Sequence, residues 1–104
     1  MKGKFDDKAR IINGGTEVEV TGPASWEDDE TGATITAWVT QGEVVANGSS
    51  AFTPSSADSW SAILTVHGGT LQPGLAPTRA HAKVSLNNGK TEPYPWNDEV
   101  ELVD

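Results

Sequence analysis

The chain has 104 residues, the length of one domain, and its 15 acidic and 7 basic residues give a net charge of −8. This negative charge argues against nucleic acid and anionic membranes as partners, because phosphate groups bind to positively charged surfaces. Cysteine is absent, so the sequence offers neither a disulfide nor a thiolate zinc site. We also expect no signal peptide and no membrane span, because no apolar run is long enough, and the localisation stays open.

The first ten residues form a basic arm ahead of an acidic body. The arm contains Lys2, Lys4, Lys8 and Arg10 against only two acidic residues. One interpretation is a frayed terminus. The other is a strap that docks on an acidic surface, including that of a neighbouring copy. We therefore divide the chain into an arm at 1–10 and a folded domain at 11–104.

Alternating apolar and polar residues predict a series of short antiparallel strands along the chain. The expected strands cover residues 8–12, 16–21, 33–41, 43–46, 50–53, 59–67, 79–87 and 98–103. No segment places apolar residues at the helical spacing i, i+3, i+4 and i+7. The sequence therefore predicts an all-β fold.

Three Asn-Gly dipeptides, at 13–14, 47–48 and 88–89, predict tight hairpin turns. The second is expected to join 43–46 to 50–53. Further on, Pro93 and Pro95 exclude a central strand around Tyr94, because proline has no N–H to give to a sheet.

The chain resembles the immunoglobulin-like and fibronectin type III group of β-sandwiches. The residues that carry this resemblance are Trp38 on the third strand and the turn Leu71-Gln72-Pro73-Gly74. That turn is similar to the segment by which such domains pass between their two sheets. The resemblance implies an antiparallel two-sheet sandwich of about seven strands, with a role in recognition or assembly more than in catalysis.

The aromatic residues divide into core and surface candidates. Trp60 shares an apolar face and is expected in the core. Trp38 is either the buried sandwich tryptophan or an outer residue beside threonines, and we favour burial because exposing an indole is costly. Trp26, Tyr94 and Trp96 lie in polar or Pro-containing stretches, where they either stack on sugars, anchor a protein interface or cap the ends of the sandwich.

An acidic run, Glu27, Asp28, Asp29 and Glu30, is the densest charge in the sequence. We expect a solvated loop, and the alternatives are a Ca²⁺ site or a contact with a basic partner. His67 and His81 lie on polar strand faces and lack the spacing of a metal site. No metal and no cofactor is therefore expected.

No catalytic motif is present: the sequence lacks a nucleophile elbow, a cysteine and a phosphate-binding loop. We expect a non-enzymatic module that binds a larger protein surface or copies of itself. By analogy with sandwiches that coat virions, its setting would be a phage capsid decoration or tail accessory protein. The alternative is an extracellular module that binds carbohydrate or a protein ligand through Trp26, Tyr94 and Trp96.

Overall fold

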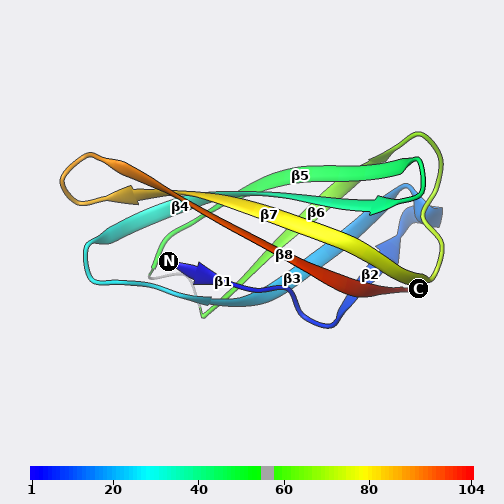
Figure 1. The fold of residues 1–104 in the computed structure, drawn as a ribbon, viewed down its shortest axis with the longest axis horizontal. Helices are drawn as coiled ribbons and strands as arrows, with labels where there is room; N and C mark the ends of the chain where they lie inside the picture. Colours follow the sequence, from blue (N-terminus) through cyan, green and yellow to red (C-terminus); the bar gives the residue numbers. More distant parts are fainter. Residues whose placement is uncertain (55–57) are drawn as a thin grey trace.

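The computed structural model describes residues 1–54 and 58–104, and within them it contains β-strands, one 3₁₀ turn and no α-helix (Figure 1). The strands are β1 (Lys2–Gly3), β2 (Lys8–Ile12), β3 (Glu17–Ser25), β4 (Glu30–Gln41), β5 (Val44–Phe52), β6 (Ser59–His67), β7 (Gly74–Leu86) and β8 (Thr91–Val103). The 3₁₀ turn η1 (Asn13–Gly15) joins β2 to β3. The prediction of an all-β chain is confirmed.

The strands close into a seven-stranded barrel, so the predicted two-sheet, immunoglobulin-like sandwich is wrong. The order around the barrel is β2-β3-β6-β5-β4-β7-β8 and back to β2, and β1 adds to β3. Two short ladders join what would otherwise be separate sheets. One is the antiparallel pairing of Val45–Asn47 in β5 with Thr65–His67 in β6. The other is the parallel pairing of Lys8–Arg10 in β2 with Glu101–Val103 in β8.

The barrel is long and narrow, with extents of 42 × 21 × 21 Å. Small side chains make this narrowness possible, because inward-facing residues fill the interior of a small barrel. Ala37 and Ala80 face each other across β4 and β7, and both are buried. The largest fully buried side chains are Trp60, Ile35, Leu64, Leu102, Val18, Val20, Val39, Val84 and Val100.

Trp38 lies on the outer face of β4, so the favoured prediction that it is buried is wrong. Its chain neighbours Ala37 and Val39 point inward and are buried. Because side chains alternate along a strand, Trp38 shares the outer face with Thr36 and Thr40. The narrow interior beside Ala37 holds small side chains in place of an indole.

Two of the three Asn-Gly turns are confirmed. Asn13 and Gly14 lie in η1 with φ angles of 53° and 71°, in the left-handed region that this pair tolerates. Gly89 has a φ of 84° in the turn between β7 and β8, where its N–H donates to the Leu86 carbonyl.

The predicted turn at Asn47-Gly48 is wrong, because both residues lie inside β5. The hairpin between β4 and β5 turns instead at Gly42, whose φ is 63°. Gly48 has a different task. A Cβ atom at this position would lie 2.7 Å from the Ile63 carbonyl oxygen, so glycine lets β6 cross close to β5.

Pro93 and Pro95 lie within β8, along a part of the strand that pairs only with β7. The Leu86 N–H donates to the Lys90 carbonyl, and the ladder continues from this pair without a bulge. Hydrogen-bonded pairs alternate with non-hydrogen-bonded ones, so both prolines fall in pairs whose backbone groups point away from β7. The prolines are therefore accommodated because this half of β8 is an edge.

We predict different effects of alanine substitution at Asn47 and Gly48 on the free energy of unfolding. Gly48→Ala should lower the free energy of unfolding by about 1–3 kcal/mol, because the new methyl group meets the β6 backbone. Asn47→Ala should change it by less than about 0.5 kcal/mol, because Asn47 is an exposed strand residue. Urea unfolding followed by circular dichroism measures both. A costly Asn47→Ala with a harmless Gly48→Ala would contradict this account of β5.

Candidate functional site

A groove of about 330 Å³ lies where β1 approaches the edge half of β8. We call it the β1–β8 groove. Its lining comes from Lys2, Gly3, Lys4, Pro23, Ala24, Ser25 and Tyr94. This volume is at the lower end of the range typical of small-ligand pockets. The groove exists because β1 pairs with β3 on one side and leaves the facing edge of β8 unpaired.

Two lysine side chains point outward beside the groove, on a segment whose backbone is anchored to β3. β1 is held to β3 through the pairs Lys2–Ser25 and Gly3–Ala24. Gly3 faces inward, where an added Cβ would lie 2.9 Å from the Trp96 ring. Since side chains alternate along an extended chain, Lys2 and Lys4 point to solvent, and both are exposed.

Backbone contacts fix Lys4 at the end of this segment. Its N–H donates to the Pro23 carbonyl at 3.3 Å, and its own carbonyl accepts a 2.8 Å hydrogen bond from Trp60 Nε1. Gly22 makes this approach possible, because a Cβ there would lie 1.7 Å from the Lys4 oxygen. The chain that carries the two ammonium groups is thus held at its backbone.

An aromatic cluster lies beneath the groove. Phe5 packs edge-on against Trp60 with ring centroids 5.4 Å apart, and Trp60 meets Trp96 in the same manner at 5.6 Å. Tyr94 continues the cluster, 5.7 Å from Trp96, and reaches the groove. Trp96 Nε1 is buried without a hydrogen-bond partner among the described residues. The cluster gives the groove a rigid apolar base.

The structure brings together only some of the residues that the sequence singled out. Lys2, Lys4 and Tyr94 line the β1–β8 groove, and Trp96 lies below it. Trp26 is half-buried, packs against the core and does not line the groove. Pro23 and Ser25 were missed, because the pairing of β1 with β3 has no signature in the sequence.

The remaining basic residues of the predicted arm lie on β2. Lys8 and Arg10 are exposed and line a separate shallow hollow. A guanidinium nitrogen of Arg10 lies 3.8 Å from a carboxylate oxygen of Glu19. Because both side chains are partly exposed, this ion pair contributes little to stability. Between the two basic pairs, Phe5 enters the core. Residues 1–10 thus run along the barrel wall, with their basic side chains on the outside.

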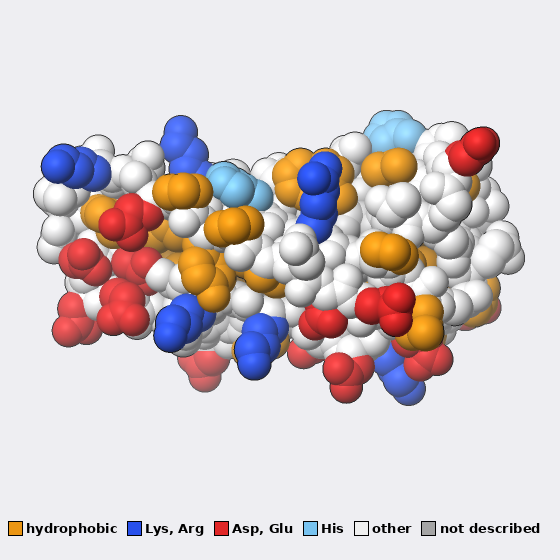
Figure 2. Space-filling model, in the orientation of Figure 1, with side chains coloured by type: hydrophobic (Ala, Val, Ile, Leu, Met, Phe, Trp, Pro, Cys, Tyr) orange, Lys and Arg blue, Asp and Glu red, His pale blue; other side chains and the backbone are white. Residues whose placement is uncertain are grey.

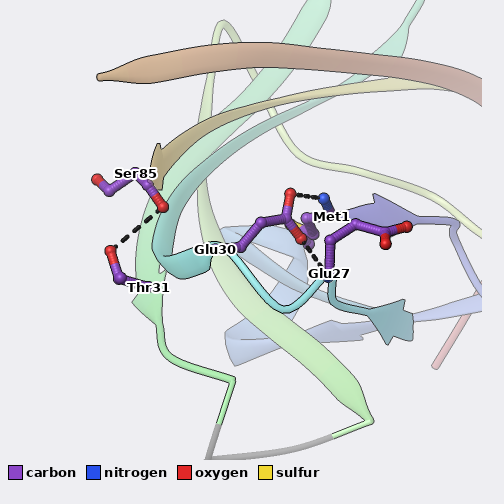
Figure 3. A network of polar contacts seen from close by, with 5 residues as sticks. All are labelled: Met1, Glu27, Glu30, Thr31 and Ser85. Carbon is purple, nitrogen blue, oxygen red and sulfur yellow. Dashed lines mark hydrogen bonds and ion pairs between the residues drawn. The ribbon is translucent and has the colours of Figure 1, made fainter. Parts of the chain in front are cut away.

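The acidic run forms a turn in which one member is buried (Figure 3). Glu30 accepts a hydrogen bond from the Glu27 N–H and forms an ion pair with the Met1 ammonium group. The side chains of this pair are 0% and 5% exposed. Glu27, Asp28 and Asp29 remain exposed. Glu30 is therefore an internal partner of the chain, and three carboxylates are left on the surface.

The environment of the Met1 ammonium makes it dependent on nearby carboxylates. Burial lowers the pKa of this group, while Glu27, Glu92 and Asp29 act in the opposite direction. A buried charge without a partner carries a high desolvation cost. The Glu30 carboxylate, in contact with the ammonium, offsets that cost.

Replacing Glu30 by glutamine should lower the free energy of unfolding by about 3 kcal/mol, because it leaves the buried ammonium unpaired. The matched control is Asp28→Asn, which removes an exposed carboxylate from the same turn and should cost less than about 0.5 kcal/mol. Urea unfolding at neutral pH measures the two losses. Equal losses would contradict the role of Glu30.

A second matched pair tests the aromatic cluster. Trp60→Phe and Trp96→Phe both shorten an indole, but only Trp60→Phe removes a hydrogen bond, to the Lys4 carbonyl. Trp60→Phe should therefore cost about 1–3 kcal/mol more in unfolding free energy. Denaturant unfolding followed by circular dichroism checks the difference. A larger loss for Trp96→Phe would show that its indole N–H has a partner.

Basic and acidic side chains are interspersed over the face of the barrel that Figure 2 shows. In Figure 2 the acidic side chains gather at the left end and along the lower right of the face, and the basic side chains lie in the middle and also at both ends. Among residues 1–54 and 58–104, no group of three or more histidine or acidic side chains is arranged to hold a metal ion. In the same residues, no helix is long and apolar enough to cross a bilayer.

Comparison with known proteins gives no family for this chain: no family model and no curated protein matches it. The expected phage-virion setting came from the resemblance to immunoglobulin-like sandwiches. The closed barrel overturns that resemblance, and the virion expectation loses its basis with it.

Proposed function

We propose that this protein is a non-enzymatic binding module that docks an acidic segment of a protein surface in the β1–β8 groove. The observation that carries the proposal is the meeting of Lys2, Lys4 and Tyr94 in one open groove. These residues come from opposite ends of the chain. Their combination of two ammonium groups and an aromatic ring suits a short acidic peptide segment with an apolar side chain.

The surroundings of the groove define what such a segment contacts. Pro23, Ala24 and Tyr94 supply apolar surface, and the two exposed lysines supply charge for carboxylates. At Pro93 and Pro95 the backbone facing the open edge of β8 has no N–H to donate, so a further strand cannot pair fully with this edge. Side-chain contacts, and not backbone hydrogen bonds, therefore recognise the acidic segment.

The charge of the whole molecule restricts the partner further. A net charge of −8 repels extended polyanions, so the attraction is local to the groove. The exposed turn Glu27–Asp29 of a second copy is one segment of suitable chemistry, after Trp26 in the sequence. Binding to copies of itself is thus one form of the same function, and a foreign acidic segment is the other.

A fluorescently labelled peptide with the sequence of residues 24–33 tests the groove by anisotropy. We expect binding that weakens with salt and weakens about 3–10-fold in the variant Lys2→Ala/Lys4→Ala. The matched control, Lys83→Ala/Lys90→Ala, removes the same charge from exposed positions of the β7–β8 hairpin and should bind like wild type. Absence of binding, or equal weakening in both double variants, would contradict the proposal.

Light scattering then separates the two forms of the function. Self-association predicts a molar mass that falls with rising salt and with Lys2→Ala/Lys4→Ala. A monomer at all concentrations, combined with peptide binding, assigns the groove to a foreign partner.

A further inference from the structure

A second hollow, of about 240 Å³, lies on the outer wall of the barrel, away from the residues that line the β1–β8 groove. It is lined by Trp38 and Thr40 from β4, Pro77, Thr78 and Arg79 from β7, and Asn97 and Asp98 from β8. Three adjacent strands therefore contribute to it. Within a rigid sheet these side chains keep fixed spacings, which is a requirement for specific binding.

The register places three of these residues in one row across the sheet. Trp38 pairs with Arg79 between β4 and β7, and Arg79 pairs with Asn97 between β7 and β8. The Arg79 guanidinium carbon lies 4.5 Å from the centre of the Trp38 ring, a cation–π contact. This contact holds the planar guanidinium group beside the indole.

Asp98 is also fixed in place. The Thr78 hydroxyl donates to the Asp98 carbonyl at 3.0 Å, and Asp98 Oδ1 accepts the Glu99 N–H at 2.8 Å. Thr78 is buried, so this attachment belongs to the barrel wall. The Glu99 N–H points away from β7, so the Asp98 carboxylate lies on the side of β8 opposite Arg79 and only the Asp98 backbone borders the hollow.

Two polar side chains at the hollow, Arg79 and Asn97, still have hydrogen bonds to make, and Trp38 holds the first of them. Within residues 1–54 and 58–104, Arg79 forms no ion pair and the side-chain amide of Asn97 makes no hydrogen bond. A guanidinium offers donors, and an amide offers both donors and acceptors. Neighbouring hydroxyl groups, which donate and accept, satisfy both.

We propose that this hollow binds one neutral pyranose unit of a saccharide. The Arg79 guanidinium and the Asn97 amide each bridge two neighbouring ring hydroxyls, while Trp38 and Pro77 form an apolar wall for the C–H groups of the sugar. The volume is below that of pockets for drug-sized ligands and suits a single ring. The net charge of −8 disfavours sulfated or carboxylated sugars.

Nuclear magnetic resonance of the ¹⁵N-labelled protein tests this site with maltotriose, cellotriose, xylotriose and mannotriose as probes. One of these neutral trisaccharides should shift the Trp38 indole and Asn97 side-chain amide signals saturably, with a dissociation constant of about 1 mM. Signals of Tyr94 and the β1–β8 groove should stay in place. If none of the four sugars shifts the Trp38 and Asn97 signals at 20 mM, the proposal is overturned, and Trp38 and Arg79 are a cross-strand packing pair only.

Matched variants exclude a non-specific effect. Asn97→Ala should weaken binding of the active trisaccharide about 5–10-fold, since it deletes a hydrogen-bonding group from an exposed position. Asn87→Ala, which changes another exposed asparagine at the β7–β8 turn, should bind like wild type. Equal affinity of both variants would also overturn the proposal. Lys2→Ala/Lys4→Ala should leave sugar binding unchanged, which keeps this test separate from that of the groove.

Discussion

The architecture depends on two short ladders that close the ring of strands. Three residue pairs join β5 to β6 and three join β2 to β8. The longer ladders, such as β7 with β8 and β4 with β5, are equally compatible with an open two-layer arrangement. Closure draws the strands around a narrow interior that alanines line, and it forces Trp38 to the outside. Both candidate binding surfaces follow from this closure. The β1–β8 groove lies where β8 lacks a second partner strand, and the second hollow lies on the outer wall that carries Trp38.

The strands themselves could be predicted from the sequence, because alternation is a local property that each segment carries alone. Residues 8–12 and 59–67 were predicted with the bounds that the structure shows, and the turns at Asn13-Gly14 and Asn88-Gly89 were also correct. The ring closure could not be predicted in this way. A parallel pairing between Lys8–Arg10 and Glu101–Val103 joins the two ends of the chain, and no local pattern records it.

The errors about single residues have the same origin. Asn47-Gly48 carries the signal of a turn, but Gly48 serves the close passage of β6, which involves residues distant in sequence. Glu30 belongs to a run of charge that is typical of a solvated loop, yet it contacts the Met1 ammonium inside the protein. For the candidate site, Lys2, Lys4 and Tyr94 could be selected by residue type. Their meeting in one groove required the pairing of β1 with β3.

The prolines of β8 have a consequence for the behaviour of the protein in concentrated solution. A barrel that is split at one end exposes part of a strand, and exposed strands recruit further strands into aggregates. At Pro93 and Pro95, two consecutive positions of β8 whose backbone groups point toward the opening, an incoming strand finds carbonyl oxygens without the matching N–H groups. The same opening that exposes Tyr94 is therefore unsuited to seed fibrils, and the molecule can keep a binding groove open without a covering strand.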